Sequence, residues 1–519
     1  MSADIIYMKD TNRRHHVTSI WVIFYLLLQT TTLLLTNVSA LFLSSNDHHN
    51  NLAKQLQQQM ILAPLTRGGN LPFRRLCADF GTNVSLSEMV YARFLCQGDR
   101  IEQARLRRSA NEQVFGVQIA TNDVQEGAAA IRLAVAANAD FVDLNCGCPI
   151  HEATRRGLGS ALLRSPTNLA QLVEGMIDAT NNEIPISVKV RLGRDANSIN
   201  VGEVVQQLRQ VGAAAVTIHG RTAIQGYSKP SDWNLISNVV QENHRYYSED
   251  GLSQQQQQQQ QKRQLSRMAI VGNGDIFTHY EAKRRFDESQ VDAVMVGRGA
   301  LIKPWIFQEY ATQQSWEPTL EDRVSIYRRL TCYCQDHFGN DVMGRKKAWN
   351  FLPWHFDFFA RYLALPEDQY GEYTAGPLIQ MRKPSLDDSS SSSIPPLEHL
   401  LSHRSNTAHD RIASILWGAD SDQDAVMTLT AFAESHDFIK IQQQQQQQHP
   451  DDSDVTTTEL ANIRNEKDGK WHKRRGRNPK PQRTPEEIAT IRAERAAKKA
   501  RIAAVEEEEE EAQKLHGND

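Results

Sequence analysis

The chain has 519 residues, of which 40% are hydrophobic and 23% charged, enough apolar surface to bury a sizeable core. Six cysteines in so long a chain exclude a disulfide scaffold, and none belongs to a His/Cys cluster of zinc-finger spacing, so we expect no metal. The net charge of -4 says little, because a basic run near Lys470–Arg483 and an acidic run at Glu506–Glu511 are separated along the chain.

The N-terminus begins with an apolar segment. Arg13 and Arg14 precede the stretch Val17–Leu43, and Val38-Ser39-Ala40 fits a small-residue cleavage site. Residues 1–45 therefore indicate a secretory-type signal peptide, with an uncleaved anchor or a non-functional extension as alternatives. A working leader predicts an organelle reached through the secretory route, or a membrane tether. Otherwise we expect the cytoplasm or nucleus.

Eight short apolar runs, each followed by helical patterning, recur in the next 250 or so residues. This alternation predicts a parallel sheet, and eight units predict a (β/α)8 TIM barrel over residues 55–312, with a polar insertion at about 243–266. An open doubly wound sheet is the alternative, although the first turn, Thr66–Asn70, lacks G-x-G-x-x-G. The expected strands are Met60–Pro64, Asn83–Met89, Val114–Ile119, Phe141–Asn145, Ile186–Arg191, Ala215–His219, Met268–Gly272 and Ala293–Gly297.

Helical periods without strands follow the predicted barrel. Arg323–Phe338 and Arg345–Tyr362 are examples, and we expect a smaller all-helical domain over residues 318–440. Residues 441–519 are expected to form a disordered charged tail with a solvated helix at Pro485–Leu515.

Reactive side chains follow the fourth predicted strand, and functional residues of TIM barrels lie at the C-terminal ends of strands. This strand ends in Asp143-Leu144-Asn145-Cys146-Gly147-Cys148-Pro149. A thiol with a pKa near 8.5 is mostly protonated at neutral pH, which suits a proton donor better than a nucleophile. A buried structural cysteine is the plainer alternative.

Basic side chains and glycines mark the strands that follow. Lys189 and Arg191 alternate with apolar residues, and a lysine in the barrel mouth would need an anion, although a surface ion pair is also possible. Glycines in Asn273–Asp275 and Gly297–Gly299 allow backbone N–H groups to approach a phosphate after strands 7 and 8. Together these features suit flavin mononucleotide (FMN), whose reduced ring carries negative charge near N1 and O2.

At these residues the sequence resembles the tRNA-dihydrouridine synthases, in particular the eukaryotic branch that modifies the variable loop. The resemblance runs from about Leu62 to Tyr310, with weaker similarity to Tyr362. It is carried by these motifs: Leu62-Ala63-Pro64, Ser87-Glu88-Met89, Gly116-Val117-Gln118, Leu144–Pro149, Gly157–Leu162, Val188–Arg191, His219-Gly220-Arg221-Thr222, Asn273-Gly274-Asp275 and Gly297–Ala300.

The resemblance implies a role for each matching position. Cys148 would be the catalytic proton donor, with Cys146 as the rival, and Asn145 and Arg191 would bind the substrate uracil. The residues implied to bind the cofactor are Pro64, Leu65, Thr66, Gln118, Lys189, His219, Asn273, Gly274, Asp275, Gly297 and Arg298.

The implied reaction is the reduction of specific tRNA uridines to 5,6-dihydrouridine. NADPH or NADH would reduce FMN, flavin N5 would give hydride to uracil C6, and Cys148 would protonate C5, once the uridine has left the stack. We expect a monomer whose partner is tRNA. An FMN oxidoreductase acting on a free pyrimidine, such as a dihydroorotate dehydrogenase relative, and a non-catalytic RNA-binding barrel are the alternatives.

The predicted helical domain would grip the tRNA. Arg345-Lys346-Lys347 is expected to begin one aromatic-rich helix containing Trp349, Phe351, Trp354, His355 and Phe358. These aromatics could stack bases or, as the simpler alternative, belong to the core. The run Lys470–Arg477 is a candidate RNA-binding arm, a nuclear-localisation-like patch or a plain solvated tail.

This sequence departs from the family pattern in three places, one of which is a long insertion with the glutamine tract Gln254–Gln261 between strands 6 and 7. Zinc-finger modules, common before the barrel in the eukaryotic branch, are replaced by the apolar leader, which puts the modified tRNA position in doubt. Leu65 stands where methionine is usual.

Overall fold

The computed structural model describes residues 52–227, 229–247, 267–370 and 394–448. In this part of the chain, eight parallel strands close into a ring, in the order β1-β2-β4-β5-β6-β7-β8-β9 and back to β1. A ninth strand, β3 (Val90–Tyr91), pairs with the end of β4 outside the ring. The barrel strands are β1 (Met60–Leu62), β2 (Val84–Leu86), β4 (Val114–Ala120), β5 (Phe141–Cys146), β6 (Ile186–Arg191), β7 (Ala215–His219), β8 (Ala269–Asn273) and β9 (Ala293–Val296).

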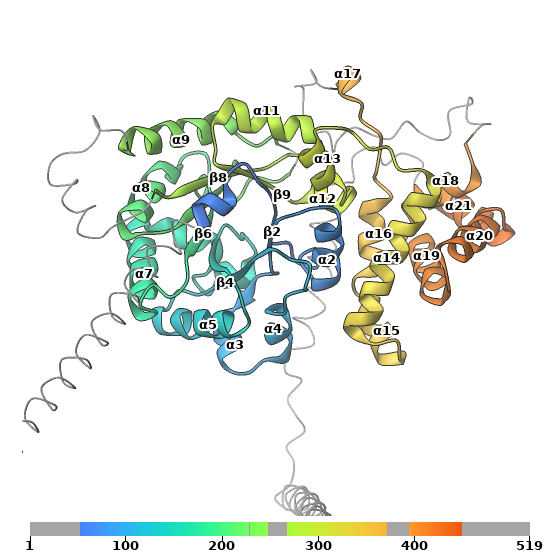
Figure 1. Cartoon of the computed structure of the whole chain (residues 1–519), viewed down its shortest axis with the longest axis horizontal. Coiled ribbons are helices and arrows are strands. Elements are labelled where there is room, and N and C mark those ends of the chain that lie inside the picture. Colours follow the sequence, from blue (N-terminus) through green and yellow to red (C-terminus); the bar gives the residue numbers. More distant parts are fainter. Residues whose placement is uncertain (1–51, 228, 248–266, 371–393, 449–519) are drawn as a thin grey trace, which may run out of the picture. The chain divides into compact units, whose positions relative to one another are not determined.

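The predicted (β/α)8 barrel and all eight of its strands are confirmed, with small differences at their ends. β1 stops before Pro64, which has no N–H to give to a ladder. Helices follow the strands on the outside of the ring (Figure 1). They are α2 (Leu71–Asp79), α3 (Ala92–Cys96), α4 (Arg100–Arg105), α5 (Val124–Ala136), α6 (His151–Thr154), the 3-10 helix η1 (Gly159–Arg164), α7 (Pro166–Ala179), α8 (Val201–Val211), α9 (Trp233–Tyr247), α11 (His279–Ser289), α12 (Arg298–Ile302) and α13 (Ile306–Thr312).

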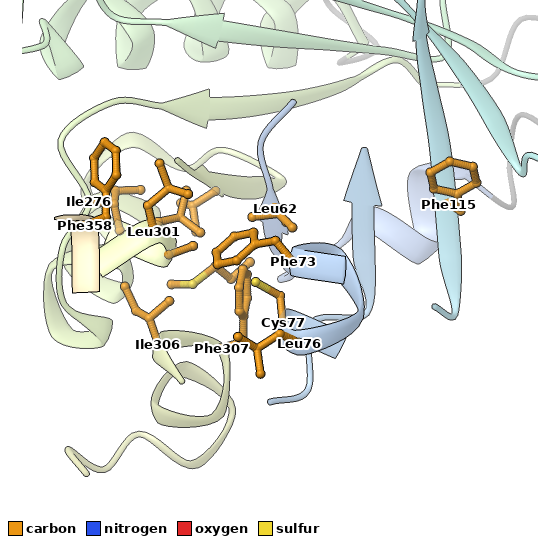
Figure 2. Packing of buried hydrophobic residues seen from close by; sticks show 14 of the residues in the cluster. Leu62, Phe73, Leu76, Cys77, Phe115, Ile276, Leu301, Ile306, Phe307 and Phe358 are labelled. Carbon is orange, nitrogen blue, oxygen red and sulfur yellow. The ribbon is translucent and has the colours of Figure 1, made fainter. Parts of the chain in front are cut away.

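Strand alternation divides the core into two parts. Val188 and Val190 of β6 point into the layer between the strands and the helices, so the residue between them, Lys189, points into the ring. Small and branched residues such as Ala215 and Val271 fill the ring itself. Figure 2 shows the outer layer where α2 meets α12 and α13, built from Leu62, Phe73, Leu76, Cys77, Leu301, Ile306 and Phe307.

The barrel is followed by helices, as the sequence predicts. α14 begins with a capping box in which Thr319 and Asp322 satisfy each other's backbone N–H groups, and it packs against α2 of the barrel. Because barrel and helices lie in one compact unit, the boundary between residues 312 and 318 stays a prediction. The helices are α14 (Leu320–Phe338), α15 (Val342–Ala348), α16 (Leu352–Phe359), α17 (Glu367–Tyr370), α18 (Pro396–Leu401), α19 (Asn406–Gly418), α20 (Asp422–Ala433) and α21 (His436–Gln448).

The expected single helix from Arg345 to Tyr362 is wrong. It is two helices, because Pro353 can occupy only the first turn of a helix and α16 therefore starts afresh at Leu352. The alternative that its aromatics belong to the core is largely correct, since Phe358 is buried and Trp349 and Trp354 pack against the core.

Several predictions lie outside the described residues: the leader, most of the insertion at 243–266, the basic run at Lys470–Arg483 and the helix at Pro485–Leu515. Among the residues that the structure describes, no helix is both long and apolar enough to cross a membrane.

Candidate functional site

The ends of β5 to β8 bring most of the predicted site residues to one edge of the barrel. Arg191, His219 and Asn273 stand directly beside one another in register across β6, β7 and β8. Asn145 of β5 is likewise paired with Lys189 of β6. Residues paired across parallel strands share a level of the barrel. Arg191, His219 and Asn273 therefore form one level at its C-terminal mouth, and Asn145 and Lys189 lie one level deeper, two residues back along β6.

A buried hydrogen-bond chain supports the cysteine loop. Asn145 Nδ2 donates to Gln118 Oε1 (2.9 Å), and Gln118 Nε2 donates to Asp143 Oδ2 (2.8 Å). Asn145 Oδ1 accepts the N–H of Cys148 (3.0 Å), which fixes the loop after β5. Ser187 Oγ donates to the other Asp143 oxygen (2.6 Å). Asp143 and Ser187 were missed from the sequence, although Asp143 lies two residues before Asn145, on the same face of its strand.

The two cysteines after β5 have different surroundings. Cys146 is fully buried in the outer layer between strands and helices, and this burial raises the pKa of its thiol well above the usual value. Cys148 is partly exposed. Its carbonyl accepts the N–H of Ser160 (3.0 Å), and a Cβ on Gly159 would lie 2.5 Å from that carbonyl. The geometry therefore favours Cys148 over its rival as a donor to a ligand in the barrel mouth.

Lys189 extends into the mouth with an amide as its hydrogen-bond partner. Its Nζ donates to Asn273 Oδ1 (3.0 Å), and Asn273 Nδ2 donates to the Met295 carbonyl (2.7 Å). Burial, and then the charge of Arg191, lowers the pKa of Lys189 to about 8, against the opposing effect of Asp143. A lysine that is costly to charge and lacks a directly bonded carboxylate suits an anionic ligand.

His219 is held as a neutral ring. Burial lowers its pKa well below the usual value, and the cations Lys189 and Arg191 add to this effect. Its Nε2 lies 3.3 Å from Nη1 of Arg221. Because a guanidinium can only donate, Nε2 accepts and the ring proton sits on Nδ1.

The opposite end of the site is an arginine cluster around Asp275. Arg221 Nη2 lies 2.7 Å and Arg298 Nη2 2.8 Å from the Asp275 carboxylate, which also accepts the N–H of Ser231. The carboxylate is thus engaged within the protein, so an anion bound at this end of the site would contact the arginines and not Asp275 itself. Arg221, whose side chain is fully buried, is a third residue missed from the sequence, after Asp143 and Ser187.

Removing the Asp275 charge is expected to damage this cluster. In Asp275→Asn two buried or half-buried arginines lose their counter-charge, so the free energy of unfolding should fall by about 3–5 kcal/mol at neutral pH. Chemical denaturation of the variant and wild type measures this. The exposed pair Lys283–Asp287 offers a control, since Asp287→Asn should change stability by less than ~1 kcal/mol. Equal stability of all three proteins would contradict the assignment.

Other predicted residues shape the loops around the mouth. Arg191 Nη1 donates to the Thr222 carbonyl (2.6 Å), tying β6 to the loop after β7. Pro64, Leu65 and Thr66 form the partly exposed start of the loop after β1. A Cβ on Gly297 would lie 3.4 Å from Leu65, so this loop and the start of α12 meet.

In the described ranges no group of His, Cys, Asp and Glu side chains could hold a metal ion.

The family model for dihydrouridine synthase (Dus) matches residues 61–357, which is more than half of the chain and contains every predicted site residue. The chain belongs to the dihydrouridine synthase family. It is 37% identical over 310 residues to a Cryptococcus neoformans tRNA-dihydrouridine(47) synthase [NAD(P)(+)], and 36% identical over 310 residues to a human protein named tRNA-dihydrouridine(47) synthase [NAD(P)(+)]-like.

Each of these matches covers 59% of this chain, but 41% of the fungal and 44% of the human relative, so the chain spans less than half of their length. Among solved structures, a 2-naphthoyl-CoA reductase complex is 12% identical with a TM-score of 0.36, covering 49% of this chain and 50% of that one. Histamine dehydrogenase from Rhizobium sp. 4-9 has a TM-score of 0.37 at 12% identity, covering 53% and 49%. Structural similarity with such low TM-scores and sequence identities does not indicate a shared function.

Proposed function

We propose that this chain reduces specific uridines in tRNA to 5,6-dihydrouridine, using a flavin, FMN, and NADPH or NADH as reductant. The observation that carries the proposal is a partly exposed thiol, Cys148, on the loop after β5, held by Asn145, whose strand position is paired with that of the cation Lys189 on β6. Family membership and the names of the relatives support it.

The charges of the site fit FMN. At one end, two arginines share one carboxylate, Asp275, which leaves a positive charge for a phosphate. At the other, Lys189 has Asn273 as its hydrogen-bond partner and can stabilise negative charge at N1 and O2 of a flavin ring. When bound, the flavin supplies hydride to C6 of the uracil.

The remaining steps belong to the protein. Cys148 donates the proton that C5 of the uracil takes up as C6 is reduced, and Asn145 holds the Cys148 loop in place through its N–H. His219, neutral, adds no further positive charge beside Lys189. Arg191 holds the loop after β7 in place at one side of the mouth through its hydrogen bond to the Thr222 carbonyl.

A basic hollow at the junction of barrel and helices supports RNA as the substrate. It has a volume of about 840 Å³ and is lined by residues of α2, of the loop after α4 and of α14, among them Arg75, Arg107 and Arg108. Burial lowers the pKa of His337, in its wall, to about 4, and the charges of Arg107 and Lys347 add to that shift. Two of these arginines are paired with carboxylates, Arg75 with Asp336 (2.9 Å) and Arg108 with Asp140 (3.0 Å). Arginines near the surface of such a hollow can exchange these partners for the phosphates of an RNA backbone.

Purified full-length chain should be yellow or take up FMN. It should oxidise NADPH and add two hydrogen atoms to uridines of unmodified tRNA, as measured by mass spectrometry of the digested RNA. Free uracil and uridine are the control substrates. A protein that bound no FMN, or that reduced the free pyrimidine and left tRNA unchanged, would overturn the proposal.

A further inference from the structure

The loop between β1 and α2, residues 63–70, is held by buried side chains from separate parts of the chain. Glu88 Oε1 accepts the N–H of Arg67 (2.6 Å), and Arg74 Nη1 donates to the Gly69 carbonyl (2.8 Å). Both come from the barrel. A third contact comes from α16, nearly 300 residues further along, where His355 meets Asn70.

Asn70 carries several of this loop's hydrogen bonds. Its Oδ1 accepts the N–H of Phe73 (3.1 Å) and so caps α2, which fixes the orientation of the amide. Its Nδ2 therefore faces the other way, where it donates to the Arg67 carbonyl and lies 3.1 Å from Nε2 of His355. Because an amide nitrogen only donates, Nε2 accepts, and the imidazole is neutral with its proton on Nδ1.

The surroundings of His355 keep the ring neutral, while its buried Nδ1 has no hydrogen-bond partner among the described residues. The side chain is fully buried, and burial lowers its pKa to about 3. Its ring stacks on Phe73 of α2 with a centroid separation of 4.6 Å. The helix that carries it, α16, packs against α12, α14 and α19. One imidazole thus contacts both the cap and the first turn of the helix that follows the loop.

We infer that His355 is a positioning residue through which the helices after the barrel hold the β1–α2 loop in the shape that seats the cofactor. The loop starts with Pro64, Leu65 and Thr66, and Leu65 also meets Gly297 at the start of α12. Losing the imidazole leaves an Asn70 hydrogen unsatisfied in a buried place, which favours opening of the loop. The link to the cofactor rests on the proposed function, whereas the link between the helices and the loop does not.

The test compares two buried histidines of the helical region in the full-length chain. His355→Phe keeps an aromatic ring on Phe73 but removes the acceptor. His409→Phe is the matched control, because His409 is also fully buried and its Nε2 donates to the His403 carbonyl (2.7 Å), away from the loop. Asn70→Ser removes the donor from the other side and keeps a hydroxyl that can cap α2.

FMN titration and hydrogen exchange are the two readouts. We expect the FMN dissociation constant to rise about tenfold, the equivalent of ~1.4 kcal/mol, in His355→Phe and in Asn70→Ser, with no further rise in the double variant. His409→Phe should change it less than about twofold. Amides of residues 64–70 should exchange faster in His355→Phe than in wild type and in His409→Phe.

The outcomes separate the two proposals. Equal FMN affinity and equal exchange in the two histidine variants would overturn the role of His355, even if both melt at lower temperature. Faster amide exchange with unchanged FMN affinity would show that His355 holds the loop but would overturn the inference that the loop's shape affects FMN binding. A wild-type protein that binds no FMN would overturn the proposed function, and the exchange experiment alone would then decide whether His355 holds the loop.

Discussion

Cys148→Ala is expected to slow dihydrouridine formation by about 10²–10⁴-fold, while the protein still binds FMN and oxidises NADPH. In the proposed reaction the thiol acts when C5 is protonated, after the steps that involve cofactor and reductant. Single-turnover reduction of tRNA by prereduced enzyme, followed by mass spectrometry, measures the affected step directly. Cys148→Ser should be nearly as slow, because a hydroxyl is a much weaker acid than a thiol.

Cys146→Ala is the control for this experiment. Cys146 lies in the outer layer of the core, behind the strand, and its thiol does not reach the mouth. Its replacement should cost a little stability, about 1 kcal/mol, and leave the single-turnover rate within about twofold of wild type. A slow Cys146→Ala protein beside a fast Cys148→Ala protein would exchange the roles of the two residues.

Lys189→Met should lose function and gain stability at the same time. Without the cation, negative charge on the reduced ring is no longer stabilised, and we expect reduction by NADPH to slow by about 10²-fold. The apolar side chain avoids the cost of a buried charge, so the free energy of unfolding without cofactor should rise by about 1–2 kcal/mol. Stopped-flow absorbance and chemical denaturation give the two values. A variant that is both less stable and fully active would refute this account.

The lowered pKa of Lys189 also predicts a pH dependence. Its pKa is about 8 in the folded protein and 10.5 when unperturbed, so between these values the unfolded chain binds more protons. Stability should therefore rise with pH across this window in wild type, and flavin reduction should fall as Lys189 loses its charge. Lys189→Arg, whose side chain stays charged, should show neither change, even if it is slower throughout.

The sequence predicted the barrel because each of its strands is a buried apolar run flanked by turn residues. Such runs are visible locally, and their order determines a parallel ring. The break between α15 and α16 is hard to see in the sequence because apolar periodicity continues across it, and Pro353 alone marks the start of the second helix. The two-residue strand β3 is too short to show any period.

The placement of the candidate site residues was predictable where one strand end carries several polar residues, as in Asn145–Cys148. It was not predictable where a side chain acts through a distant partner. Arg221 gains its importance from Asp275, 54 residues away, and His355 from Asn70, 285 residues away. Nothing in local sequence marks such pairs, because burial and orientation select the partner only after the chain has folded.

The seam of the barrel has a consequence for synthesis. Met60 of β1 pairs with Val294 of β9. One edge of the first strand therefore has unpaired backbone N–H and C=O groups until most of the barrel has been synthesised. Loop closure over such a separation is slow, and an exposed edge can recruit other chains meanwhile. Nascent chains arrested before β9 should therefore depend on chaperones, whereas those that already expose β9 should become protease-resistant in a single late step.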